Sequence, residues 1–143
     1  MLRRVDHSTI FVFIAATYTP VALLVLDGTV RALVLAVVWA GALCGVLFSL
    51  AWINAPRALQ AVLYVALGWV VVAALPQMLE RLDVQPIALI GAGGVLYTLG
   101  AVIYSRQRPD PWPQTFGFHE VFHGLVIGAA ACQFAAIAGW IVT

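Results

Sequence analysis

The sequence of 143 residues has few charges and no lysine. Charged residues make up 9% of the chain and hydrophobic residues 64%, whereas soluble domains have about 25% charged residues. Side chains this apolar cannot all be buried in a water-soluble body of this size, because small domains leave much of their surface exposed. The composition therefore excludes a soluble enzyme and a disordered regulator, and the net charge of +1 argues against a nucleic-acid partner. A polytopic membrane protein remains.

Long stretches without Asp, Glu, Lys or Arg divide the chain into spans. Each is close to the length of about 20 residues that a helix needs to cross the hydrocarbon of a bilayer. In lipid every backbone N–H and C=O must be bonded internally, so these stretches are predicted to be helices. The expected fold is all-α, a single transmembrane domain over residues 1–143 with five membrane-spanning helices. The predicted spans are Ser8–Leu26, Ala32–Ile53, Ala58–Leu79, Pro86–Ser105 and Val121–Thr143.

Arginines are unevenly distributed between the two sides that these spans define. The side with the N-terminus carries most of them, and the other side carries Arg31 and Arg81. The positive-inside rule then predicts a multi-pass cell-membrane protein with a cytoplasmic N-terminus and an outside C-terminus. The arginines on the N-terminal side are Arg3, Arg4, Arg57, Arg106 and Arg108.

Small residues in the middle of the spans have a packing interpretation. Cys44 and Cys132 are expected to be buried small hydrophobic residues rather than a disulfide or a metal pair. Two pairs of glycines have the spacing that lets helices approach closely, so we expect both at helix–helix contacts. These pairs are Gly41/Gly45 and Gly124/Gly128.

All three histidines lie beside spans, on the side predicted to be cytoplasmic. Ionisable groups in or beside a span are costly and usually functional. His7 follows Asp6 at the start of the first span, and His119 and His123 stand at the start of the last. The topology brings these two helix ends to the same membrane depth, although they lie far apart in the sequence.

The spacing of the last two histidines suits a metal site. His119 and His123 are four residues apart, so both imidazoles project from one helix face. Two such ligands fit one divalent cation, most simply zinc, which takes four tetrahedral positions. Asp6 or His7 can supply a third ligand and water the fourth, or Asp6 can bond that water and act as its base. Zinc lowers the pKa of a bound water to about 7, which makes hydroxide available for hydrolysis.

Each of these residues also has a structural interpretation. The two histidines of the last span can be polar surface at head-group level, His7 can be an interfacial residue, and Asp6 can stabilise its own helix N-terminus. Glu120 points about 100° away from the histidine face and is expected to be a helix-start carboxylate. The motif His119-Glu120-x-x-His123 matches zincin proteases, but the other spans offer no carboxylate as a further ligand, so a protease is not expected.

Polar residues inside the spans are sparse. A stripe on the first predicted helix continues from Asp6, and its hydroxyls either line a cavity or bond backbone groups freed by the proline. Gln133 lies near the same face as His123 and about 15 Å deeper, and its expected role is a hydrogen bond across the bundle. The stripe consists of Thr9, Phe13, Thr17 and Pro20.

Three parts of the chain resemble hemolysin III proteins. Val5–Ser8 with Ile14–Pro20 resembles their third membrane helix, and Leu96–Tyr104 resembles their sixth. Arg108–Pro113 with Phe116–His123 resembles the loop and start of their seventh. These parts follow in the right order over nearly the whole chain, which makes the resemblance specific. The family belongs with the progestin and adipoQ receptors and, more distantly, with alkaline ceramidases.

The resemblance implies a seven-helix protein with a zinc site near the cytoplasmic face that hydrolyses lipid amide bonds. It assigns His119 and His123 to two zinc ligands of the last helix and Asp6 to the aspartate beside the metal and its water. The family's third zinc histidine lies on a helix without a counterpart here, so the first two helices are expected to be missing. Gln133 stands where many relatives have another histidine. Either the chain is truncated, or His7 replaces the lost ligand, or the site is inactive.

The sequence thus favours an integral membrane hydrolase of a lipid amide or ester, with zinc as cofactor and membrane lipid as partner. The family name also implies cytolysis, although no span carries the sustained polar face of a pore. The alternative is a non-enzymatic membrane bundle that senses lipid or has a structural role.

Overall fold

A computed structural model of the chain describes residues 2–52, 55–112 and 115–142, with side chains described only from Ser8 onward. These residues form helices, short connections and one isolated bridge between Trp112 and Phe116. Within them, five helical segments are long and apolar enough to cross a membrane, which confirms the predicted all-α membrane bundle. The segments are α1 (Leu2–Val25), α2 (Gly28–Ala51), a third span made of α3 (Arg57–Gly68), η1 (Trp69–Ala74) and α4 (Leu75–Arg81), α5 (Val84–Arg106), and α6 (Phe118–Ala136) extended by η2 (Ile137–Ile141).

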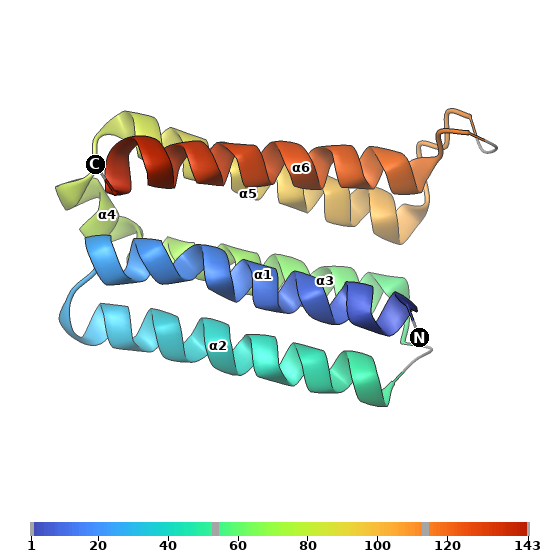
Figure 1. Ribbon diagram of the computed structural model, residues 1–143, viewed down its shortest axis with the longest axis horizontal. Coiled ribbons are helices and arrows are strands. Elements are labelled where there is room, and N and C mark those ends of the chain that lie inside the picture. Colours follow the sequence, from blue (N-terminus) through green and yellow to red (C-terminus); the bar gives the residue numbers. More distant parts are fainter. Residues whose placement is uncertain (1, 53–54, 113–114, 143) are drawn as a thin grey trace.

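Consecutive spans run antiparallel, so alternate connections gather at the same end of the bundle (Figure 1). The start of α1, the α2–α3 connection and the α5–α6 loop lie at one end, which we call the histidine end. The α1–α2 and α4–α5 connections lie at the other, which we call the Asp27 end. The predicted alternation of the connections is confirmed. Which end faces the cytoplasm stays a prediction.

The best-packed part of the bundle surrounds α1. Its buried side chains recur every three or four residues, and the helix contacts α2, α3 and η2. A Cβ atom at Gly45 of α2 would overlap the ring of Phe11, and one at Gly41 would lie 2.6 Å from Leu67 Cδ1. The predicted close contact at this glycine pair is confirmed. The buried side chains of α1 are Phe11, Ile14, Ala15, Tyr18, Val21, Ala22 and Val25.

Helices α5 and α6 form a second packed pair. A Cβ atom at Gly93 of α5 would lie 3.2 Å from the carbonyl oxygen of Ala129, and one at Gly100 would lie 3.4 Å from the ring of Phe122. These two glycines let the helices approach closely along one seam.

The other predicted glycine contact is confirmed only at Gly128. A Cβ atom at Gly124 would meet nothing within 4 Å, and one at Gly128 would make only an ordinary contact of 3.6 Å with Leu96. The reason is helical phase, because Phe122 and Ala129 of α6 face α5 in their place.

The third span is interrupted, whereas the sequence predicts one helix over Ala58–Leu79. Helix α3 ends at Gly68, the 3₁₀ segment η1 follows, and α4 begins at Leu75. Pro76 has no N–H, so the carbonyl of Val72 lacks its α-helical partner, and the N–H of Leu75 bonds it in the 3₁₀ pattern.

A side chain of α1 holds this interruption. The Tyr18 hydroxyl donates a hydrogen bond to the carbonyl of Gly68 and accepts one from the N–H of Val71 at 2.9 Å. Irregular backbone at membrane depth is tolerated only where its polar groups are bonded inside the protein. Tyr18 supplies both of these bonds.

Both cysteines are free, as predicted, but only Cys132 is partly buried. Cys44 is exposed on the outer face of α2, so the prediction that it is buried is wrong. An apolar sequence does not distinguish the face of a span that meets a neighbouring helix from the face that meets lipid.

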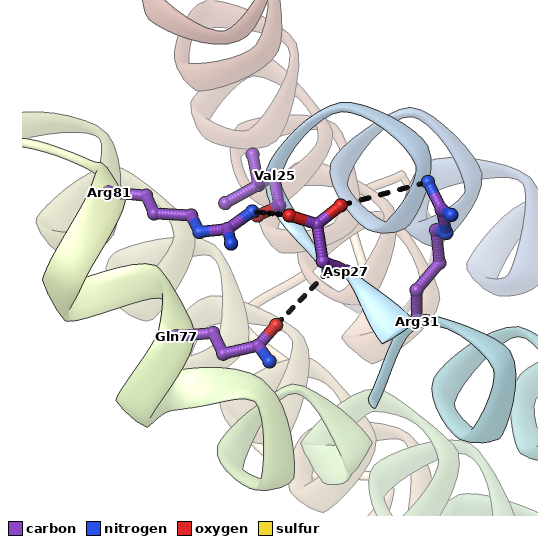
Figure 2. Close-up of polar contacts among 5 residues, drawn as sticks. All are labelled: Val25, Asp27, Arg31, Gln77 and Arg81. Atoms are coloured by element: carbon purple, nitrogen blue, oxygen red, sulfur yellow. Dashed lines mark hydrogen bonds and ion pairs between the residues drawn. The ribbon is translucent and has the colours of Figure 1, made fainter. Parts of the chain in front are cut away.

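A polar network closes the Asp27 end (Figure 2). The Asp27 carboxylate lies 2.5 Å from Arg81 Nη1 and 3.9 Å from Arg31 Nη1. Arg81 also donates to the carbonyl of Val25 at 3.0 Å, and the N–H of Asp27 donates to Gln77 Oε1 at 3.2 Å. The network ties the α1–α2 turn to α4.

Candidate metal centre

The first turns of α6 carry the two candidate histidine ligands. The rings of His119 and His123 have centroids 4.5 Å apart, and their Nε2 atoms are 3.0 Å apart. In this arrangement one Nε2 donates a hydrogen bond and the other accepts it. Two imidazole nitrogens on a tetrahedral zinc ion lie about 3.4 Å apart, so a small ring rotation would adapt the pair to the metal.

Aromatic rings support the histidine pair. His123 is half-buried, and its ring packs on Phe122 with centroids 5.2 Å apart. Phe122 is buried and packs in turn on Tyr104 of α5, with centroids 5.1 Å apart. His119 is exposed. The pair is therefore anchored on its bundle side and open at the other.

Two side-chain oxygens fix the start of α6. The N–H of Gly117 donates to Glu120 Oε2 at 2.8 Å, and the N–H of Phe118 donates to Asp110 Oδ1 at 3.0 Å. A Cβ atom at residue 117 would lie 2.6 Å from that Asp110 oxygen, so a larger residue would displace the carboxylate from this position. Glu120 is thus confirmed as a helix-start carboxylate, the second half of a capping box, and its bond to Gly117 does not favour the role of a protease base.

The start of α1, which carries Asp6 and His7, lies at the same end of the bundle as the start of α6 (Figure 1). Their side chains lie outside the described residues, so the third zinc ligand and the role of Asp6 stay predictions. Helix α1 begins at Leu2, which places Asp6 beyond the first turn, where a helix dipole has little effect. Among the side chains that are described, no three His, Cys, Asp or Glu residues form a group able to hold a metal.

A cavity of about 230 Å³ lies between the two packed parts of the bundle. Helices α1 and α3 line one side, and α5 and α6 line the other. Three residues of the predicted stripe on α1 are in its wall, namely Thr9, Phe13 and Thr17. The interpretation of this stripe as a cavity lining is confirmed.

The alternative role of the stripe, repair of the backbone at Pro20, is not supported. The Thr17 hydroxyl donates to the carbonyl of Ile14 at 2.7 Å, and the Thr19 hydroxyl donates to that of Ala15 at 3.0 Å. The carbonyl that loses its partner to a proline is the one four residues earlier, and here that residue is Ala16.

Helix α6 connects the cavity to the histidine pair. Phe122 and Val126 line the cavity within a turn of His123. Gln133 lines it further along the same helix. The predicted hydrogen bond of Gln133 across the bundle is wrong, since its amide bonds no residue in the described part of the chain.

Three further polar residues line the cavity, namely Trp69, Tyr97 and Thr98. In the sequence each is a single polar group inside an apolar span, which is only a weak indication of a functional role. Trp69 Nε1 donates to Thr98 Oγ1 at 3.0 Å, and Thr98 donates to the carbonyl of Gly94 at 2.8 Å. The Tyr97 hydroxyl is buried and has no hydrogen-bond partner among the described residues.

Comparison with known proteins gives consistent matches. A family model described as "Haemolysin-III related" matches residues 1–134. The "Hemolysin-3 homolog" of Bacillus subtilis (strain 168) is 31% identical over 137 residues, which cover 96% of this chain and 62% of the relative. The "Hemolysin-3" of Bacillus cereus is 30% identical over 132 residues, covering 92% and 58%. The chain thus spans about three fifths of the length of these relatives. No solved structure matches it.

Proposed function

The chain belongs to the haemolysin-III related family, and we propose that it is a zinc-dependent hydrolase of a membrane lipid amide or ester. Family membership confirms the resemblance seen in the sequence, and the five apolar helices make the chain a multi-pass membrane protein. The observation that carries the proposed activity is the convergence of His119 and His123, with Nε2 atoms 3.0 Å apart beside an apolar cavity.

In this proposal the two histidines would hold the zinc ion through Nε2, and His7 at the start of α1 would complete the protein ligands, which leaves Asp6 free to act on the water. Zinc held there would lower the pKa of a water molecule to about 7 and so supply hydroxide at neutral pH. The Asp6 carboxylate would orient that water and accept the proton that it gives up. The capping bonds at Gly117 and Phe118 keep the first turn of α6, and with it His119, in place.

The cavity supports a lipid as the substrate. Its wall is mostly apolar, so an acyl chain can lie between α1 and α6. Phe122 and Val126 then guide the chain away from His123, and the bond to be cleaved remains at the histidine end. The substrate class that fits is a lipid with an amide or ester near its head group.

Cytolysis, which the names of the two relatives imply, enters our proposal as a consequence of lipid hydrolysis. Removal of acyl chains from bilayer lipids would weaken a membrane without any pore. Dye release from liposomes is therefore expected with the native protein and lost in a His119→Ala/His123→Ala double variant. Release that persists in the double variant would separate lysis from this site.

Zinc content and turnover test the proposal directly. Protein purified in lipid nanodiscs should contain about one zinc per chain and release fatty acid from a ceramide-type substrate. The double variant should lose both. An Asp6→Asn variant should keep the metal and lose turnover, whereas a His7→Ala variant should lose the metal.

Each result distinguishes the alternatives. Zinc retained in the double variant would overturn the metal site. Zinc bound by the native protein without turnover on any lipid amide or ester would favour the non-enzymatic alternative, a lipid sensor or structural bundle in which the metal stabilises the fold.

A further inference from the structure

A half-buried carboxamide on the cavity wall has no hydrogen-bond partner among the described residues. Gln133 lines the cavity of about 230 Å³ and also a neighbouring cavity of about 50 Å³. Its amide forms no hydrogen bond to any residue that the structure describes. At this depth there is no bulk water, and an amide left unpaired is costly. Gln133 therefore needs a partner that comes from outside the described part of the chain.

The polar neighbours of Gln133 are already bonded within the protein. Tyr18 uses its hydroxyl on the carbonyl of Gly68 and the N–H of Val71. Thr17 donates to the backbone of its own helix at 2.7 Å. These groups line the smaller cavity together with Gln133. The side-chain amide of Gln133 therefore has unused hydrogen-bond donors and an unused acceptor, whereas the other groups of this wall are apolar or already hydrogen-bonded.

Helix α6 sets the distance between this amide and the histidine pair. The helix is continuous from Phe118 to Ala136, so the ten residues from His123 to Gln133 correspond to a rise of about 15 Å. An extended carbon chain advances about 1.2 Å per bond, as an extended polypeptide does. A ligand whose head group lies at the histidines therefore reaches Gln133 after roughly twelve bonds.

We propose that Gln133 determines specificity for a lipid whose acyl chain carries a hydroxyl group about twelve bonds from the head group. A carboxamide can donate and accept at once, and a hydroxyl does the same, so the two satisfy each other. A plain methylene chain would leave the amide unpaired. The inference rests on the proposed function only in placing the head group at the histidine pair.

Binding of two matched probes tests this inference. Native protein in nanodiscs is titrated with octadecanoic acid and with the same acid bearing a hydroxyl on its twelfth carbon. The hydroxylated probe should bind about fivefold to tenfold more tightly, as expected for one hydrogen bond in an apolar site. A hydroxyl on the sixth carbon should give no such gain. In a Gln133→Met variant, which keeps the length of the side chain, the preference should disappear while the plain acid binds as before.

A control variant separates the role of Gln133 from that of the other unpartnered polar group in the cavity wall. Tyr97→Phe removes the other unpartnered polar group of the cavity wall and should leave the preference intact. Both titrations measure binding alone and involve no hydrolysis, so failure of the enzyme does not count against Gln133. Equal binding of both probes by the native protein, no binding of either, or a preference that survives in Gln133→Met would overturn the inference.

Discussion

The hydroxyl of Tyr18 in α1 accepts a hydrogen bond from the N–H of Val71, 2.9 Å away, at the point where the third span leaves the α-helix. The same hydroxyl donates to the carbonyl of Gly68, so one side chain satisfies both backbone groups at the interruption. The cavity and Gln133 lie directly beside it. The shape of the cavity wall thus depends on this contact between α1 and the third span.

Tyr18→Phe should destabilise the protein by about 1–3 kcal/mol, because it removes both hydrogen bonds that the hydroxyl makes to the backbone at the interruption. SDS-induced unfolding in mixed micelles measures the change. Tyr97→Phe is the matched control: it removes a buried hydroxyl that bonds none of the described residues, so it should cost nothing or slightly stabilise. Equal losses for the two variants would contradict the role assigned to Tyr18.

Gly45→Ala should destabilise the α1–α2 contact by about 1–3 kcal/mol, since the new methyl group would overlap the ring of Phe11. That ring is 2% exposed and has no room to move aside. Gly124→Ala has open space around it and should be tolerated. Thermal unfolding in detergent compares them, and a tolerated Gly45→Ala would show that α1 and α2 are farther apart than described.

Arg81→Ala should destabilise the Asp27 end by about 1 kcal/mol, because Arg81 bonds both the Asp27 carboxylate and the carbonyl of Val25. Arg31 is only 3.9 Å from the carboxylate and about as exposed, so Arg31→Ala should change stability by less than about 0.5 kcal/mol. High salt should reduce the difference only partly, since the bond to Val25 does not involve a second charge. A larger loss from Arg31→Ala would reverse this ranking.

Asp110→Ala should fray the first turn of α6, because the N–H of Phe118 loses its acceptor, at a cost of about 1 kcal/mol. Hydrogen exchange at the amide of residue 118 reports the fraying. Asp110→Asn keeps an oxygen at the same place and should retain most of the protection. If the proposed zinc site exists, its affinity should fall several-fold in Asp110→Ala, since His119 lies in that turn.

Local patterns in the sequence predict most of the membrane architecture. The five spans follow from composition, because the cost of placing a charge in lipid applies to each stretch by itself. The facing imidazoles of His119 and His123 follow from the period of one helix, and so does the helix-start role of Glu120. None of these features depends on what a neighbouring helix does.

Tertiary packing decided the rest. The two glycine pairs have the same spacing, yet an added Cβ atom would overlap a neighbouring side chain only at Gly41 and Gly45, because helical phase and neighbours are set by the whole bundle. The third span is interrupted before Pro76, and two backbone groups at the interruption are bonded by Tyr18, fifty residues before Gly68 in the sequence. Gln133 lines a cavity and forms no side-chain hydrogen bond to a described residue, because α1 and α6 leave space between them. Sequence alone determined which segments lie in lipid and which residues share a helix face; only the packing of those faces determined where the polar groups find partners, since that is a property of contacts between distant parts of the chain.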